Sequence, residues 1–194
     1  MTYQLKAGSL TNLRLVDVPL PPPGPGEVSV AVRAIGLNFA DVFAIWGLYG
    51  ATPSGIFTPG LEYAGYVTAV GEEITGLQVG DAVMGVTRFG AYTTALNIDH
   101  RYVLPLPTDW SLAEGAAYLV QALTAYYGLV NLGQLAYGQT VLIHSAAGGV
   151  GTFAGRIARQ LGAYTIGTVG NASKIPYLQR EGYDDWIVRN NRTF

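Results

Sequence analysis

The chain has 194 residues, of which 49% are hydrophobic and 12% are charged, and its formal net charge is −2. This composition argues against disorder and indicates a chain that buries a large core. The chain contains no cysteine, which excludes disulfides, thiolate metal ligands and thiol nucleophiles. The near-neutral charge balance also argues against a nucleic-acid binder, which needs many Lys and Arg side chains to neutralise phosphates.

The basic residues are concentrated in the last part of the chain. Residues 1–150 hold five basic and ten acidic residues, whereas residues 151–194 hold six basic and three acidic ones. An anionic ligand would prefer the second segment, although a solvated basic face explains the same asymmetry.

Neither the N-terminal residues nor the long uncharged stretch has the pattern of a targeting or membrane segment. Met1–Lys6 lacks the apolar run of a signal peptide, so we expect a cytoplasmic location. Gly115–Gly155 carries no charge, but glutamine, asparagine, histidine and frequent glycine interrupt it. Because a membrane span needs about 20 continuous apolar residues, we predict a buried helix and a buried strand there instead.

The first half of the chain has the pattern of a mostly β unit. Pro19–Gly26 is rich in proline and predicts a stiff extended segment. After it, Val28, Val30 and Val32 alternate with other residues, as in a half-buried strand. Further short strands are predicted at 63–70, 81–86, 91–96 and 101–104, which extends the β unit to about residue 105.

The second half has the pattern of helices followed by alternating strands and helices. Ser111 and Glu114 form a predicted capping box for a helix that continues through Val120, and a second helix at 123–132 ends near Gly133. Strands are then predicted at 141–144, 164–169 and 186–188, with helices at 150–161 and 173–181 between them. This order is typical of the first half of a Rossmann doubly wound parallel sheet.

The turn between the first strand and the first helix of that half is rich in glycine. It consists of Ser145, Ala146, Ala147, Gly148, Gly149, Val150 and Gly151. In this context the glycines let a pyrophosphate approach the backbone amides at the helix N-terminus, and Gly151 lets the helix pack closely on the sheet. We predict dinucleotide binding here; an ordinary tight turn is the alternative.

The end of the next strand favours NADPH over NADH. NAD sites usually place Asp or Glu there to bind the ribose hydroxyl, whereas this chain has Gly-Asn-Ala-Ser-Lys at 170–174. Lys174, one of two lysines in the chain, and Arg189, after the third strand, are placed to attract the 2′-phosphate of NADPH. For each cation alone, a solvated surface role is the alternative.

Several short motifs together resemble one superfamily. Gly36–Asp41, Gly47–Tyr49, Pro59–Gly65, Val79–Asp81, Leu123–Tyr126 and Ala146–Gly151 resemble the zinc-independent medium-chain dehydrogenases/reductases, and among them the quinone oxidoreductases. Gly8–Leu13, Asp109–Ser111 and Asn190–Arg192 also resemble the enoyl-reductase domains of modular polyketide synthases. The likeness runs the length of the chain and is specific to the superfamily, not to a substrate.

This resemblance implies a GroES-like catalytic domain over residues 1–123 and, over residues 124–194, the N-terminal half of an NADPH-binding Rossmann domain. Because a dinucleotide site needs two such halves, we expect a truncated protein that turns over poorly by itself. Zinc-dependent members carry Gly-His-Glu where this chain has Gly60-Leu61-Glu62. Leucine cannot bind zinc, so no metal is expected.

The resemblance also places Asn38, Tyr49 and Thr124 at the nicotinamide and the substrate. Asn38 would hydrogen-bond the cofactor or a carbonyl, Tyr49 would donate to a developing enolate, and Thr124 would hold the nicotinamide. The alternatives are a turn role for Asn38, aromatic packing for Tyr49 and a helix cap for Thr124. Phe43 replaces a tyrosine of some quinone reductases, and His144 is expected to be packed in the core.

The leading functional prediction is an NADPH-dependent reductase that delivers hydride to quinones or to activated C=C bonds such as enones. One alternative is an enoyl-thioester reductase domain of a modular polyketide synthase, which acts on a carrier-bound substrate. The second alternative is a non-catalytic NADPH-binding structural or interaction protein. The complete protein is a possible homodimer, and neither a nucleic-acid partner nor a membrane span is expected.

Overall fold

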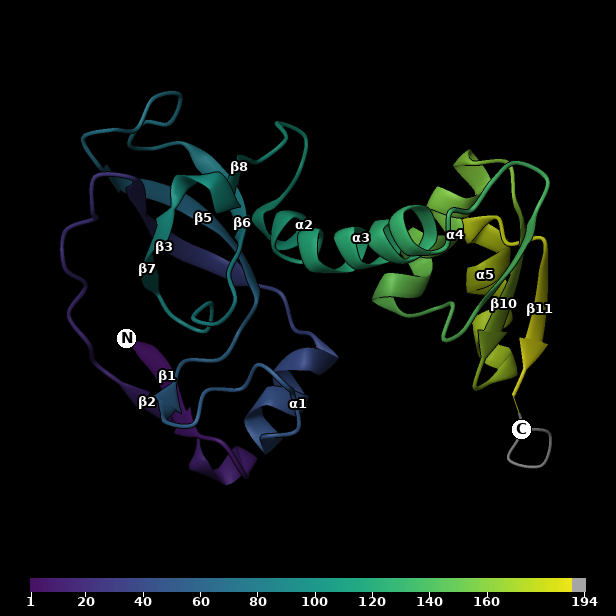
Figure 1. Ribbon diagram of the computed structural model, residues 1–194, viewed down its shortest axis with the longest axis horizontal. Coiled ribbons are helices and arrows are strands. Elements are labelled where there is room, and N and C mark those ends of the chain that lie inside the picture. Colours follow the sequence, from purple (N-terminus) through teal and green to yellow (C-terminus); the bar gives the residue numbers. More distant parts are fainter. Residues whose placement is uncertain (190–194) are drawn as a thin grey trace. The chain divides into compact units, whose positions relative to one another are not determined.

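The computed structural model describes residues 1–189 of the chain (Figure 1). They divide into two compact units, Met1–Val120 and a second unit that begins at Gln121. The predicted domain boundary between residues 123 and 124 lies in the same helix, α3 (Leu119–Tyr126), and stays a prediction. The segment 190–192, which contributes to the likeness to polyketide synthases, lies outside the described residues.

An antiparallel sheet of five strands forms the centre of the first unit, in the order β7-β3-β5-β6-β8. Its strands are β3 (Glu27–Ile35), β5 (Glu62–Val70), β6 (Ala82–Val86), β7 (Ala95–Asp99) and β8 (Val103–Pro105). The predicted apolar face of β3 is confirmed, because Val28, Val30 and Val32 lie in one buried cluster with Tyr63 and Val67. Ser29, on the other face, is buried as well. Strands β3 and β5 therefore contribute apolar faces to one core.

Two predicted strands begin too early. The strand predicted at 91–96 starts only at Ala95, and the next predicted strand starts only at Val103. In the second case the Asp99 carboxylate accepts a hydrogen bond from the Arg101 backbone N–H at 2.9 Å and holds a short 3-10 turn before the strand. Side-chain capping of this kind competes with strand pairing.

Four elements of the first unit have no counterpart in the sequence prediction. Strands β1 (Thr2–Lys6), β2 (Arg14–Val16) and β4 (Ile56–Phe57) form a small antiparallel sheet in the order β2-β1-β4, and α1 spans Phe39–Trp46. Strands this short are too brief to show a clear period. Helix α1 begins where the Asn38 backbone N–H donates to the Asp41 carboxylate at 2.8 Å, and it ends at Gly47 with a φ of 76°.

Helix α2 (Leu112–Ala116) begins at the predicted capping box, which is confirmed. Ser111 Oγ accepts a hydrogen bond from the Glu114 N–H at 3.2 Å, and the Glu114 carboxylate accepts one from the Ser111 N–H at 2.8 Å. The prediction that this helix continues through Val120 is wrong, because it ends at Ala116, with Ala117 as its C-cap.

Helix α3 (Leu119–Tyr126) starts anew after that break. Its start is fixed by the Glu62 carboxylate of β5, which accepts a hydrogen bond from the Val120 N–H at 2.9 Å. A π-helical segment, Tyr127–Leu132, follows α3 and leads to the predicted end at Gly133. The second predicted helix therefore begins earlier than expected, because a carboxylate far away in the sequence caps it.

The second unit contains the predicted alternation of parallel strands and helices. Its elements are β9 (Thr140–Ile143), α4 (Gly149–Gln160), β10 (Tyr164–Val169), α5 (Ile175–Glu181) and β11 (Asp185–Val188). The strands pair in parallel in the order β11-β10-β9, and α4 and α5 contact each other beside the sheet (Figure 1). The predicted fold class, a β-rich GroES-like domain followed by the first half of a Rossmann sheet, is confirmed.

β9, α4 and β11 each begin one residue earlier than predicted, and α5 begins two residues later. The helix predicted from residue 173 begins at Ile175, because Ala172–Lys174 forms a separate 3-10 turn. In residues 1–189, the structure contains no helix that is long and apolar enough to cross a membrane.

Candidate functional site

The glycine-rich turn leaves β9 and enters α4 along a path fixed by neighbouring strand β10. The Ala146 N–H donates to the Thr168 carbonyl at 3.0 Å, and the Gly148 N–H donates to the Ser145 carbonyl at 2.8 Å. Ser145 has a φ of 53°, a left-handed conformation that is uncommon for a residue with a side chain. The turn is therefore held in one tight conformation at the carboxyl end of the parallel sheet.

The predicted close approach at Gly151 is present. A Cβ atom at Gly151 would lie 2.6 Å from the Cα of Ala146 and 2.6 Å from the carbonyl oxygen of Ser145, both backbone atoms that cannot move aside. A Cβ atom at Gly149 would collide with the side chain of Gln121. Gly151 therefore requires glycine, as a turn does when a helix must start directly against a strand, whereas at Gly149 the flexible Gln121 side chain can move aside.

The start of α4 fits a pyrophosphate. Gly148 is the N-cap of the helix, and the first N–H groups of an α-helix have no partner within the helix. These groups, at Gly149, Val150 and Gly151, lie at the positive end of the helix dipole, where negative charge is stabilised. The residues present thus fit the phosphates of a dinucleotide, and the glycines leave room for them.

Tyr183 supports this turn from behind and was missed by the sequence analysis. Its hydroxyl donates to the Gly151 carbonyl at 2.7 Å, and its ring occupies the space that side chains at Gly155 and Gly167 would need. Burial raises the pKa of the Tyr183 hydroxyl above its ordinary range, so it remains a donor. The only sequence signal is its place after Gly182, which ends α5 with a φ of 80°.

The end of β10 carries the two predicted cations. Lys174 is exposed in the 3-10 turn that follows the strand, and the Asn171 side chain caps that turn by accepting from the Ser173 N–H at 2.8 Å. The Arg189 Nη2 atom lies 3.9 Å from where a Cβ at Gly170 would be. The structure therefore brings Arg189 to the end of β10, where the segment 170–174 contains Lys174 and no carboxylate.

His144 does not match its expected role. The side chain is exposed, not packed in the core, and its Nδ1 lies 3.2 Å from the Thr168 hydroxyl. The residue follows the last residue of β9, Ile143, and therefore lies at the rim of the sheet, where side chains leave the core.

In the first unit, Asn38 lies between two buried carboxylates. Its backbone N–H donates to Asp41 Oδ2 at 2.8 Å, and its side-chain Nδ2 donates to Glu62 Oε1 at 2.9 Å. Tyr92 also donates to Asp41 Oδ2, at 3.1 Å. Asn38 therefore has the turn role that was named as its alternative, because its backbone N–H caps the start of α1. Its side chain makes a separate contact, with Glu62.

Burial dominates the ionisation of these carboxylates. It raises the pKa of Asp41 above its ordinary value, although hydrogen bonds from Asn38 and Tyr92 oppose the shift. Burial also raises the pKa of Glu62, and the negative charge of Asp41 adds to that rise. The Oδ1 atom of Asp41 is buried without a hydrogen-bond partner within residues 1–189. Burying these two ionisable groups therefore costs free energy of folding, which their hydrogen bonds offset only in part.

The other two predicted catalytic residues have different settings. Tyr49 is 39% exposed, and its ring contacts Phe89 edge to face at a centroid distance of 6.4 Å. Thr124 lies inside α3, so the alternative that it caps a helix is wrong. Phe43 packs between Phe39 and Trp46 on α1, with centroid distances of 6.5 and 6.1 Å. The roles of Asn38, Tyr49 and Thr124 toward a cofactor or substrate stay predictions.

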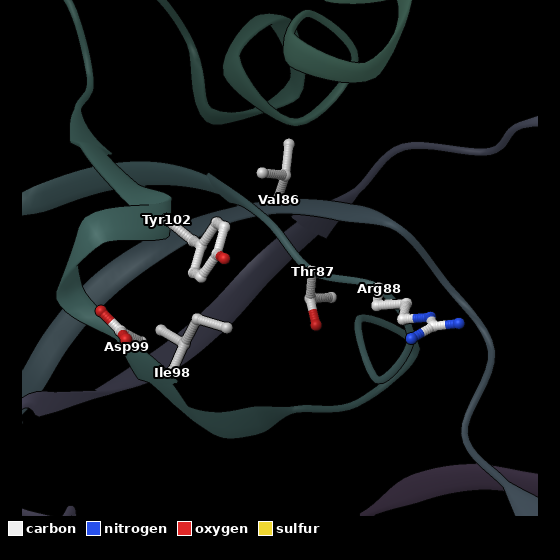
Figure 2. Close-up of a pocket in the computed structure, with 6 residues that line it drawn as sticks. All are labelled: Val86, Thr87, Arg88, Ile98, Asp99 and Tyr102. Carbon is white, nitrogen blue, oxygen red and sulfur yellow. The ribbon is translucent and has the colours of Figure 1, made fainter.

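A pocket of about 450 Å³ lies elsewhere on the first unit (Figure 2). Figure 2 shows the six residues that line it. They come from the last residue of β6 and the two residues after it, from the end of β7 and from the 3-10 turn that follows β7: Val86, Thr87, Arg88, Ile98, Asp99 and Tyr102. The guanidinium of Arg101 pairs with Asp99 at 2.6 Å and holds the pKa of that carboxyl at about 2. No predicted site residue lines this pocket.

Comparisons with known proteins show what this chain is similar to. Residues 24–108 match the family described as the alcohol dehydrogenase GroES-like domain. The chain is 42% identical over 191 residues to the spectinabilin polyketide synthase system protein NorB of Streptomyces orinoci. The matched region covers 96% of this chain and 8% of that protein.

Two solved structures share the fold. The CurK enoyl reductase has a TM-score of 0.90 and 34% identity, over 97% of this chain and 60% of that one. The quinone oxidoreductase of Escherichia coli in complex with NADPH has a TM-score of 0.89 and 34% identity, over 100% of this chain and 59% of that one. The chain thus spans less than two thirds of the length of each of these relatives.

Proposed function

We propose that the whole protein is a zinc-independent, NADPH-dependent reductase of quinones or activated C=C bonds and a member of the medium-chain dehydrogenase/reductase superfamily. Residues 24–108 match the alcohol dehydrogenase GroES-like domain, and the chain shares its fold with an enoyl reductase and a quinone oxidoreductase. The single observation that carries the proposal is the turn between β9 and α4. Gly151 admits no Cβ there, and the first N–H groups of α4 after the Gly148 N-cap would bind a pyrophosphate.

The preference for NADPH rests on the charges at the end of β10. Lys174 and Arg189 are exposed cations there, and the segment 170–174 contains no acid that would repel a 2′-phosphate. A charge-assisted hydrogen bond from either cation to the phosphate would strengthen binding of NADPH over NADH. The complex of the E. coli quinone oxidoreductase with NADPH agrees with this assignment.

Bound NADPH would supply a hydride, and a proton from solvent would complete the reduction of the C=C bond or quinone. Negative charge builds on the substrate oxygen when hydride adds, so donors placed near that oxygen lower the barrier. We assign this task to Asn38 and Tyr49 and the positioning of the nicotinamide to Thr124. Leu61 stands at the metal-ligand position of zinc-dependent members, and no group of three or more candidate metal ligands occurs in residues 1–189.

A carrier-bound enoyl thioester is the second candidate substrate. It is favoured by the 42% identity to a polyketide synthase protein and by the likeness to the CurK enoyl reductase. A protein that only binds NADPH, without turnover, is the remaining alternative. That the complete protein forms a homodimer stays a prediction.

The test is a substrate panel with the complete protein and both nicotinamide cofactors. The proposal is supported if the protein oxidises NADPH faster than NADH in the presence of simple quinones or crotonyl thioesters. The substrate that is reduced faster decides between a quinone reductase and an enoyl-thioester reductase. Binding of NADPH without oxidation by any member of the panel would leave only the non-catalytic alternative. Asn38→Ala and Tyr49→Phe should lower kcat, while Tyr66→Phe, which changes another exposed tyrosine of the first unit, should not.

A further inference from the structure

The first residue of β5, Glu62, is a buried carboxylate without a cation. Its side chain is fully buried, at 0% exposure. Within residues 1–189, no lysine, arginine or histidine forms an ion pair with it. A buried charge is costly unless hydrogen bonds compensate it, so the donors around Glu62 show what the carboxylate does.

Both oxygens of Glu62 accept hydrogen bonds. Oε1 accepts from the side-chain Nδ2 of Asn38 at 2.9 Å, and Oε2 accepts from the backbone N–H of Val120 at 2.9 Å. An ionised carboxylate accepts at both oxygens and donates at neither, so these two donors match its ionised form. One carboxylate therefore joins the start of α3 to the residue that precedes α1.

Gly36 closes the space around this carboxylate. A Cβ atom at Gly36 would collide with the Glu62 side chain and with the carbonyl oxygen of Ala116. The Gly36 backbone N–H also donates to the Glu62 carbonyl at 3.2 Å. The side chain of Glu62 is thus confined on this side by backbone atoms, which leave it no alternative place.

The confinement of Glu62 fixes the orientation of the Asn38 amide. Because the carboxylate only accepts, the NH2 group of Asn38 must face it, and the carbonyl oxygen of the same amide must face away. The backbone N–H of Asn38 is held separately by Asp41. Asn38 is therefore held at two points, and its amide has one orientation rather than two.

We propose that Glu62 is a positioning residue that acts through Asn38, by fixing which end of the Asn38 amide faces the reacting groups. This inference rests on the proposed reductase function, in which Asn38 is a catalytic residue. Because Glu62 itself is fully buried, it is given no contact with substrate or cofactor in this proposal. Its contact to Val120 makes it a helix cap as well, so the experiment must separate positioning from capping.

The central variant is Glu62→Gln in the complete protein. A glutamine has nearly the same shape, but it cannot accept at both ends, so either Asn38 or Val120 loses its acceptor. The matched control is Glu114→Gln, because Glu114 also caps a helix, α2, and does not contact Asn38. We expect kcat/KM to fall by about 10- to 100-fold in Glu62→Gln and by less than about twofold in Glu114→Gln.

A double-mutant cycle with Asn38→Ala separates the two roles. If Glu62 acts through Asn38, then Glu62→Gln should change kcat/KM by less than about twofold once Asn38 is already alanine. Thermal unfolding of all four proteins should show that each is folded at the assay temperature. If the losses from the two substitutions multiply, Glu62 acts independently of Asn38 and the proposal is overturned.

A second readout does not depend on turnover. In the protein labelled with ¹⁵N at asparagine, the side-chain NH2 signals of Asn38 are identified by their disappearance in Asn38→Ala. They should shift in Glu62→Gln and stay in place in Glu114→Gln. Unchanged signals in Glu62→Gln would overturn the positioning role even if catalysis is lost. A wild-type protein that reduces no quinone or enoyl thioester would refute the proposed function instead. The NMR result would still show whether the Glu62 carboxylate holds the Asn38 amide.

Discussion

The packing of Gly151 against the sheet gives a prediction whose size follows from the structure. In Gly151→Ala, the new Cβ would lie 2.6 Å from the Cα of Ala146 and from the carbonyl oxygen of Ser145, and 2.7 Å from the carbonyl carbon of Ala146. These are backbone atoms, so α4 must move outward. Overpacking of this kind costs about 1–3 kcal/mol, and the higher helix propensity of alanine returns at most about 1 kcal/mol.

The expected net loss for Gly151→Ala is therefore about 1–2 kcal/mol. Thermal unfolding of the complete protein should show a Tm lower by about 2–8 °C, at about 2–4 °C per kcal/mol. Because the shifted helix carries the amides that face the pyrophosphate, the Kd for NADPH should rise about tenfold, which corresponds to about 1.4 kcal/mol. Fluorescence titration with NADPH measures this second effect.

The matched control is Gly128→Ala, because Gly128 lies in the π-helical segment of the same unit and a Cβ there would meet nothing within 4 Å. It should leave the affinity for NADPH nearly unchanged, and its Tm should not fall, because alanine has the higher helix propensity and meets no clash. If Gly151→Ala is as stable as Gly128→Ala and binds NADPH equally well, the close approach does not constrain the turn and the reasoning is refuted.

Three further predictions concern charged groups. Lys174→Ala should narrow the preference for NADPH over NADH, measured as the ratio of the two Kd values, whereas Lys6→Ala, which changes the other lysine, should not; equal ratios in all three proteins would contradict a phosphate contact. Burial raises the pKa of Asp41 above 3.8, so its ionisation destabilises the fold as pH rises. The Tm of Asp41→Asn should therefore improve relative to wild type as pH rises above about 4. Hydrogen bonds from Thr165 lower the pKa of Asp184, so the stabilising effect of its carboxylate is lost as pH falls. The Tm of Asp184→Asn should therefore approach that of wild type at low pH. If the Tm difference between variant and wild type changes with pH in the same direction for both aspartate variants, these pKa shifts are misassigned.

The sequence by itself determined the features that depend on neighbouring residues. The capping box of Ser111 and Glu114, the strand at 164–169 and the glycine-rich turn before α4 were all predicted at or near their places. Each is a local signal, because a cap, a run of apolar residues or a turn needs only a few adjacent residues. The order of these elements then sufficed to predict the half-Rossmann sheet.

Only the tertiary structure decided the features that join distant parts of a unit. The break between α2 and α3 depends on Glu62, 58 residues before Val120, and the support of Gly151 depends on Tyr183, 32 residues later. The orientation of Asn38 depends on the same Glu62, 24 residues away. A buried carboxylate at the start of a strand gives no local sign of its donors, since they are supplied by packing. The sequence could therefore nominate Asn38, but the fold was needed to show what holds its amide in place.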